Sequence, residues 1–286
     1  MHIRASEMPL QADGSVYHLG LEPEDLASKV ILVGDPGRVS LVSSFFDSVE
    51  VRKQNRELHT HTGMYKGKRL SVISTGMGTD NLDIVVNELD ALVNIDLSKR
   101  CIKSTHQSLE LIRLGTCGAL QGNIDIHTPI ASRYGFGLDG LLHYYRHEAI
   151  SDEVLVDAFV AHCGWDAKHP RPYAVGCATA LLDRLAHDCL QGITLTATGF
   201  YGPQSRVLRL PLAGEDFIET LQGFQYRHLY FTNLEMETSA LYALSRLLGH
   251  QALSICIAIA NRVTGRFSQG YHSAMEDMVI KVLERI

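Results

Sequence analysis

Residues 30–38 read VILVGDPGR, in which a short apolar run ends at a turn rich in glycine. The run predicts a buried strand, Gly34-Asp35-Pro36-Gly37 predicts a tight turn, and a helix is expected after it. A similar pattern occurs further along, where residues 111–114 run into Gly115-Thr116-Cys117-Gly118. We interpret this second segment as another strand that ends in a glycine turn.

The region between these two turns also contains predicted strands, a glycine turn and a helix. Residues 58–64 and 69–75 flank a Lys-Gly-Lys turn and predict a hairpin. Gly76-Met77-Gly78-Thr79 then forms a third glycine turn and opens a predicted helix. This helix is expected because apolar residues recur at helical spacing, at Ile84, Val85, Leu89, Leu92 and Val93.

The alternation of strands and helices continues to the end of the chain. Helices are predicted at 154–163, 237–248 and 272–286, strands at 194–198 and 253–260, and loops at 94–109 and 202–214. Such alternation predicts an α/β protein whose sheet is covered by helices on both faces. Because no linker-like segment or change in composition divides the chain, we expect a single domain at 16–286 after a flexible tail at 1–15.

Composition and charge exclude several classes of protein. Hydrophobic residues make up 45% of the 286 residues and the formal net charge is -6, without the basic excess that nucleic-acid binders carry. No apolar run approaches the length that spans a bilayer, and the first residues lack the apolar core of a signal peptide. The six cysteines form no C-x-x-C pair, which fits a reducing compartment. We expect a cytoplasmic protein without a membrane or nucleic-acid partner.

The glycine turns are suited to anions, because backbone N–H groups can approach a ligand closely there. Gly76 and Gly78 lack the third glycine of a dinucleotide fingerprint, and no G-x-x-x-x-G-K-[ST] motif is present. The turns therefore predict an anion site but not nucleoside triphosphate hydrolysis.

A set of short segments, in order along almost the whole chain, resembles the nucleoside phosphorylase family and, within it, the uridine phosphorylases. These segments are VYHLGL at 16–21, GDPGR at 34–38, RE at 56–57, STGMG at 74–78, RLGTCG at 113–118, FYGPQSR at 200–206, EMETSA at 235–240 and NR at 261–262. The resemblance implies a mixed, partly barrel-like central β-sheet flanked by helices, which agrees with the predicted alternation of strands and helices.

The resemblance also implies a phosphate site. It places Gly34, Arg38, Arg113 and Thr116 around phosphate, with Arg56 reaching across from a neighbouring subunit. Arginine suits this role because its planar fork of donors matches phosphate oxygens.

For the sugar, the resemblance implies that Glu237 accepts hydrogen bonds from both ribose hydroxyls. Met236 would pack on the ribose, and Glu235 would support the segment, which we interpret as the start of the helix that runs to Leu248. His18 would reach the ribose 5′-hydroxyl in the neighbouring subunit's site.

For the base, the resemblance implies contacts from Phe200, Gln204, Arg206 and Ile259. The amide of Gln204 offers both a donor and an acceptor, which suits the N3–H and a carbonyl of uracil. The guanidinium of Arg206 would bind the other carbonyl and stabilise negative charge on the departing base. The aromatic ring of Phe200 would stack on the base or wall it.

One acid of the purine enzymes and nucleosidases has no counterpart. Those relatives carry an aspartate after the strand near Ala260 that protonates the purine N7, whereas this chain has Asn261, whose amide cannot supply a proton. We therefore predict the cleavage of uridine by phosphate to uracil and ribose 1-phosphate. Positioning and electrostatic stabilisation would carry catalysis, with Arg38, Arg56, Arg113, Gln204 and Arg206 as the catalytic residues.

Phosphate would be a co-substrate, and neither a cofactor nor a catalytic metal is expected. Some bacterial relatives bind a cation at a subunit interface near the position of Glu57, but Met77 and Asn81 do not clearly preserve that site, so no such ion is predicted. The long segment 94–109 favours a homodimer over a hexamer, with active sites shared between subunits.

Three other functions remain open at this point. The first is a phosphorylase of broader or purine specificity. The second is a hydrolytic nucleosidase, which would have no use for Arg38, Arg56 and Arg113 around one anion. The third is a nucleoside-binding protein without activity. Phosphate dependence and turnover separate these alternatives.

Overall fold

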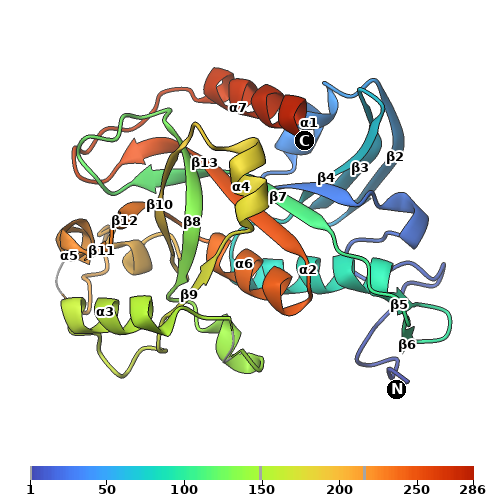
Figure 1. Ribbon diagram of the computed structural model, residues 1–286, viewed down its shortest axis with the longest axis horizontal. Coiled ribbons are helices and arrows are strands. Elements are labelled where there is room, and N and C mark those ends of the chain that lie inside the picture. Colours follow the sequence, from blue (N-terminus) through green and yellow to red (C-terminus); the bar gives the residue numbers. More distant parts are fainter. Residues whose placement is uncertain (1, 148–149, 215–216) are drawn as a thin grey trace.

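The structure, a computed structural model, describes residues 2–147, 150–214 and 217–286. A mixed β-sheet forms its centre and is flanked by helices, as predicted (Figure 1). The first half contains β1 (Lys29–Val33), α1 (Gly37–Ser43), β2 (Ser48–Asn55), β3 (Leu58–Tyr65), β4 (Lys68–Ser74), α2 (Thr79–Asn94), β5 (Ile95–Asp96), β6 (Cys101–Ile102), β7 (Glu110–Ala119) and β8 (Pro129–Gly137). The second half contains α3 (Glu153–Cys163), β9 (Tyr173–Gly176), α4 (Thr179–Leu185), β10 (Leu190–Thr196), α5 (Phe217–Gly223), β11 (Gln225–Tyr226), β12 (Leu229–Glu235), α6 (Thr238–Leu247), β13 (Gln251–Asn261) and α7 (His272–Arg285).

Strands β1 to β4 form one end of the sheet. Strand β1 pairs in parallel with β4 and β7, whereas β2, β3 and β4 form an antiparallel meander. The predicted hairpin of β3 and β4 is confirmed. Strand β2 was not predicted, because half-buried and exposed residues alternate along it and it has few apolar side chains.

Five strands, β7, β8, β10, β12 and β13, close into a barrel-like ring. In this ring β7 pairs with β13, β13 with β8, β8 with β10 and β10 with β12. The ring closes because β12 returns to β7, where Asn233 and Leu234 pair with Ala119 and Gly118. The closure brings the ends of β7, β12 and β13 together.

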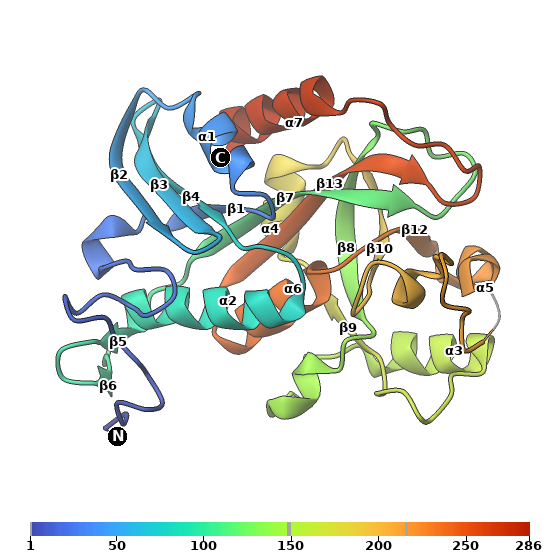
Figure 2. The same ribbon diagram turned by 180° about the vertical axis from the view of Figure 1, so that it is seen from behind.

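Helices cover the sheet from two sides. Helix α7 lies on one side, whereas α2 and α6 lie together on the other (Figures 1 and 2). The main apolar core fills the space between these helices and the sheet. A second, aromatic core lies under α3 and α5, where the rings of Phe136 and Phe231 meet edge to face with centroids 5.4 Å apart. No helix among the described residues is long and apolar enough to cross a bilayer.

Two predictions about local structure are wrong. Residues 115–118 do not form a turn, because β7 continues through them to Ala119. Glu235 does not begin the last-but-one helix, because it ends β12 and α6 begins only at Thr238. In both places the strand is held by pairing with β13 or β10, partners that lie far away in the sequence.

Residues 2–15, predicted as a flexible tail, pack against the hairpin of β5 and β6. The Ile3 amide donates to the Arg100 carbonyl at 2.8 Å, and Arg100 Nη1 donates to the Met8 carbonyl at 2.6 Å. The side chain of Met8 is buried. Segment 94–109, predicted as a loop, contains the β5–β6 hairpin that contacts these residues.

Candidate active site

Two glycine turns lie side by side at one edge of the sheet. They meet because β1 and β4 are parallel neighbours with Val33 opposite Ser74, so the turns that follow them begin at the same level. A Cβ atom on Gly34 would lie only 3.4 Å from the Gly76 carbonyl oxygen and 3.6 Å from Arg38 Nη2. The guanidinium of Arg38 therefore lies against this pair of turns.

Arg38 is a cation with an unused donor. Its Nη1 donates to the Leu114 carbonyl at 3.1 Å, while its buried Nε has no hydrogen-bond partner. Burial, and then the nearby charge of Arg113, lower the pKa of Arg38. A buried N–H without an acceptor is costly, and an anion bound at these turns would supply the missing acceptor.

Arg113 links this anion site to two carboxylates. From β7 its Nη1 lies 3.2 Å from Glu235 Oε2, and its Nη2 pairs with Glu237 Oε2. Nη1 also donates to Cys256 Sγ at 3.1 Å, while the buried Nε again has no partner. Burial alone would lower the pKa of Arg113, but the charges of Glu237, Cys256 and Glu235, in that order, outweigh it and raise the pKa.

The Glu235-Met236-Glu237 segment connects β12 to α6. Glu235 accepts hydrogen bonds from Thr196 Oγ1 at 2.7 Å and from the amides of Glu237 and Thr238 at 3.0 Å, so its carboxyl group holds the segment in place. Glu237 Oε1 accepts from the Gly78 amide at 2.9 Å. The Glu237 carboxylate therefore lies between the third glycine turn and Arg113.

Three of the four predicted base-binding residues, Phe200, Gln204 and Arg206, share one loop. Arg206 Nη1 donates to the Phe200 carbonyl at 2.7 Å and to Gln204 Oε1, and its guanidinium carbon lies 3.8 Å from the centre of the Phe200 ring. Gln204 is buried, and its carbonyl accepts from Arg262 Nη1 at 3.0 Å. Burial, and then the charge of Arg262, lower the pKa of Arg206 to about 10.

The remaining predicted site residues are more dispersed. Thr116 and Ile259 lie on the paired strands β7 and β13, and both are partly buried. Met236 is partly buried beside Glu237. Arg56 is exposed at the turn between β2 and β3.

His18 lies apart from the carboxylate that would bind ribose. Its Nδ1 is 2.7 Å from Glu88 Oε1, and Glu88 is on α2. Gly78, which contacts Glu237, directly precedes this helix. At a rise of 1.5 Å per residue, Glu88 is ~15 Å along the helix from Gly78. The ring of His18 therefore lies far from the Glu237 of its own chain.

Comparison with known proteins shows the family of this chain. The family model of the phosphorylase superfamily matches residues 28–285. This range includes every strand and every α-helix described above, but it does not include His18.

This chain belongs to the phosphorylase superfamily.

Relatives within this superfamily differ in their substrates. The chain is 31% identical over 271 residues to a uridine phosphorylase of Thermococcus kodakarensis, covering 93% of this chain and 84% of that protein. It is also 28% identical over 249 residues to a DeoD-type purine nucleoside phosphorylase of Oceanobacillus iheyensis, covering 87% of this chain and 88% of that protein.

A solved structure of a nucleoside phosphorylase also resembles this chain. A Trypanosoma brucei nucleoside phosphorylase described as showing uridine phosphorylase activity superimposes with a TM-score of 0.87 at 30% identity. The match covers 97% of this chain and 98% of the other. The chain is thus an enzyme of the purine and uridine phosphorylase family.

A pH-dependent contribution to stability is expected from Glu235 in this phosphorylase. Burial is the largest influence on its pKa; Arg113 lowers the pKa and Glu237 raises it, with a net value of about 8. An unfolded glutamate titrates near ~4.3, so between these values the folded state binds the extra proton and stability falls as pH rises. The maximal slope is ~1.4 kcal/mol per pH unit.

Glu235→Gln is expected to remove this decline, because glutamine resembles the protonated acid. Urea unfolding at pH 5, 6, 7 and 8 measures it: the variant should gain stability relative to the wild type as pH rises. The exposed Glu219→Gln serves as the control. Parallel stability curves for wild type and Glu235→Gln would contradict the raised pKa.

Gly115 provides the space for Arg113. A Cβ at this position would lie 2.2 Å from Arg113 Nη1 and 2.9 Å from Cys256 Sγ. Gly115→Ala is therefore expected to displace the guanidinium, to cost roughly 1–3 kcal/mol of stability, and to raise the KM for phosphate. Thermal unfolding and phosphate titration measure these effects. In the control Gly122→Ala the nearest atom is 3.7 Å away, so both quantities should stay near wild type; equal behaviour of the two variants would refute the contact.

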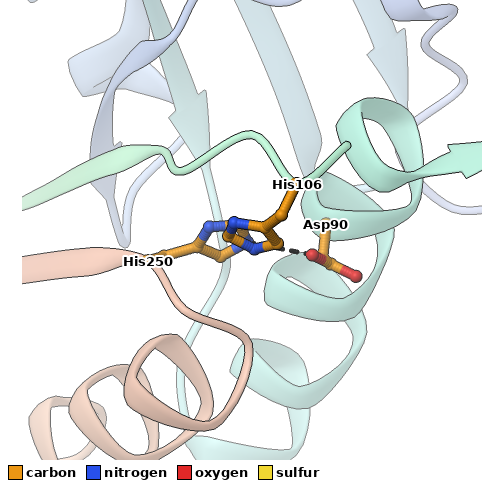
Figure 3. Close-up of side chains that lie close together, drawn as sticks. All are labelled: Asp90, His106 and His250. Carbon is orange, nitrogen blue, oxygen red and sulfur yellow. Dashed lines mark ion pairs between the residues drawn. The ribbon is translucent and has the colours of Figure 1, made fainter. Parts of the chain in front are cut away.

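A cluster of Asp90, His106 and His250 lies outside this site, near the end of α2 (Figure 3). The Leu109 amide donates to His250 Nδ1 at 3.2 Å, so the ring proton resides on Nε2, which faces Asp90 Oδ1 at 3.2 Å. His106 Nε2 lies 2.8 Å from the Leu248 carbonyl oxygen. Because the neutral His250 ring has no free lone pair, we assign no metal to this cluster.

Some residues of the site were not predicted. Arg262 entered only as part of a matched segment, yet it holds the Gln204 backbone. Cys256 and Ser254 face Arg113 because β13 pairs with β7 and places Ser254 opposite Arg113. Their apolar surroundings in the sequence gave no signal, since only the strand register brings them to the arginine.

Proposed function

We propose that this phosphorylase cleaves uridine with inorganic phosphate and yields uracil and ribose 1-phosphate. The observation that carries the proposal is a pair of arginines, the partly buried Arg38 and the buried Arg113, next to the carboxylate of Glu237. The Nε of each is buried and has no acceptor. Phosphate would supply the missing acceptors. A vicinal diol of ribose would donate to Glu237, so the anion would lie close to the sugar.

Phosphate would attack C1′ from the face opposite the base. The glycosidic bond stretches first, and the negative charge of phosphate stabilises the positive charge that develops on the ribose. Arg38 and Arg113 hold phosphate in line, and Glu237 holds the diol. Catalysis then rests on positioning and on preorganised charge.

Uracil would leave as an anion toward Gln204 and Arg206. The pKa of Arg206, although lowered to about 10, leaves the guanidinium protonated at neutral pH. Its contact with Phe200 and Gln204 orients it before substrate binds. Little reorganisation is therefore needed when charge develops on the base.

The environment of Asn261 supports a pyrimidine. Its Nδ2 donates to the carbonyls of Gln121 and Ile124 at 2.9 and 2.8 Å, and its Oδ1 accepts from the amides of Val263 and Thr264 at 2.9 Å. The side chain is thus satisfied within its own turn. It would supply no proton to a purine N7.

The site would be completed by a second copy of the chain. His18 contacts Glu88, which lies ~15 Å along α2 from Gly78, the residue that contacts Glu237. His18 would therefore serve the ribose 5′-hydroxyl of a partner's site. Arg56, exposed on the turn between β2 and β3, would reach the partner's phosphate. We propose a homodimer as the minimal active unit, with a hexamer as the alternative.

A purine nucleoside is the second candidate substrate, since DeoD-type purine nucleoside phosphorylases match 87% of this chain. The test is base release from uridine and from inosine, with and without millimolar phosphate. Uracil release that requires phosphate, with little turnover of inosine, is expected. Preference for inosine would overturn the assignment of the base loop, cleavage without phosphate would overturn the role of the arginines, and no turnover would leave a binding protein.

A further inference from the structure

Glu88 binds the segment that carries His18 through three different donors. The amides of His18 and Leu19 donate to its carboxylate at 2.9 and 2.7 Å, and His18 Nδ1 is 2.7 Å from Oε1. A carboxylate accepts only, so Nδ1 carries the ring proton. In the neutral ring, Nε2 is then left as an acceptor that suits a hydroxyl group.

Asn55 ties the same segment to the hairpin that carries Arg56. Its Nδ2 donates to the carbonyls of Tyr17 and His18 at 3.1 and 2.8 Å. Arg56 follows directly and has a φ of 52°, a left-handed conformation that is unusual for arginine. The hairpin is fixed in turn to β4, because Ser74 Oγ donates to the Glu57 carbonyl at 2.6 Å.

We infer that Asn55 and Glu88 are positioning residues that hold His18 and Arg56 as one unit. This inference rests on the proposed function, in which the unit presents an acceptor to the ribose 5′-hydroxyl and a guanidinium to the phosphate of a partner's site. Glu88 fixes the tautomer and orientation of His18. Asn55 fixes the distance between the histidine and the arginine.

The two residues therefore have different kinetic consequences. Loss of Glu88 disturbs only the contact to the 5′-hydroxyl, whereas loss of Asn55 disturbs that contact and the phosphate contact together. 5′-Deoxyuridine, which lacks the hydroxyl, separates the two effects.

The experiment compares kcat/KM for uridine and 5′-deoxyuridine, and the KM for phosphate, in full-length variants. Wild type is expected to prefer uridine by about threefold to tenfold, the effect of one hydrogen bond. Glu88→Ala and His18→Ala should lose this preference and keep the phosphate KM, and Glu88→Gln should restore part of it. Because Glu88 acts through His18, the double variant His18→Ala/Glu88→Ala should lose no more of the preference for uridine than His18→Ala alone.

Asn55→Ala is expected to lose the preference and also to raise the phosphate KM by about threefold to tenfold. The neighbouring exposed Gln54→Ala, on the same strand, is the matched control and should resemble wild type. Wild-type preference in both Glu88→Ala and Asn55→Ala would overturn the inference, as would an additive loss in the double variant.

Amide hydrogen exchange at residues 17–21 distinguishes this result from failure of the proposed function. Exchange there should accelerate in Glu88→Ala and Asn55→Ala but not in Gln54→Ala, whichever substrate the enzyme uses. Unchanged exchange in both variants would overturn the inference. If wild type releases no uracil in the presence of phosphate, the proposed function fails while the exchange result still decides whether the two residues hold the segment.

Discussion

Arg113→Met is expected to lower kcat/KM for uridine by at least about 10²–10³ and to reduce the free energy of unfolding by roughly 3–5 kcal/mol. Methionine fills similar space but leaves Glu237 as a buried carboxylate without its cation. It also removes a proposed phosphate ligand. Steady-state kinetics and urea unfolding at pH 7 measure the two losses.

The double variant Arg113→Met/Glu237→Gln separates stability from activity. Removing both charges should recover most of the lost stability, because a neutral amide tolerates burial better than an unpaired carboxylate. Activity should stay low, because both proposed ligands are gone. Arg133→Met, at a partly buried arginine bonded to Gln191 on another strand, is the control and should keep its activity. A fully active Arg113→Met would refute the proposed phosphate site.

Arg206→Ala is expected to lower kcat for uridine by roughly 10²–10³, the usual cost of removing one preorganised donor at a developing charge. Stability should change by less than about 1 kcal/mol, since Arg206 lies in a partly exposed loop. Kinetics with uridine and with uridines that carry electron-withdrawing groups at C5 measure the effect. A more acidic base leaves more easily, so the deficit should shrink with these substrates.

Two further variants sharpen this result. Arg206→Lys keeps the charge but loses the planar fork that contacts Gln204, and it should recover only part of the rate. Arg209→Ala removes an exposed arginine from the same loop and should behave like wild type. If the deficit of Arg206→Ala were the same for every leaving group, Arg206 would not stabilise the charge of the departing base.

The fold class could be predicted because it depends on local patterns. The apolar run before Gly34 and the helical spacing in α2 are properties of neighbouring residues, and both elements were found where expected. The strand β2 and the continuation of β7 through residues 115–118 could not be predicted in this way. They form because distant strands supply their hydrogen-bond partners.

The candidate site also combines features that the sequence predicted with features that only the tertiary structure decided. Matched segments of the sequence predicted Arg38, Arg113 and Glu237 as site residues. The resemblance placed Arg38 and Arg113 around one anion, but it did not predict that Arg113 pairs with Glu235 and Glu237. Glycines at 115 and 118 suggested a turn, whereas in the structure they leave room beside strands for the side chains of Arg113 and Arg262.

By itself, the sequence determined the α/β alternation, the glycine turns and the set of charged and amide side chains, because these follow from residue type and short-range spacing. Only the tertiary structure decided that Arg113 pairs with Glu235 and Glu237, and that Glu88 and Asn55 hold His18 beside Arg56. Such pairings join residues that are tens to more than a hundred positions apart. Strand register and helix packing bring them together, and no local pattern encodes that.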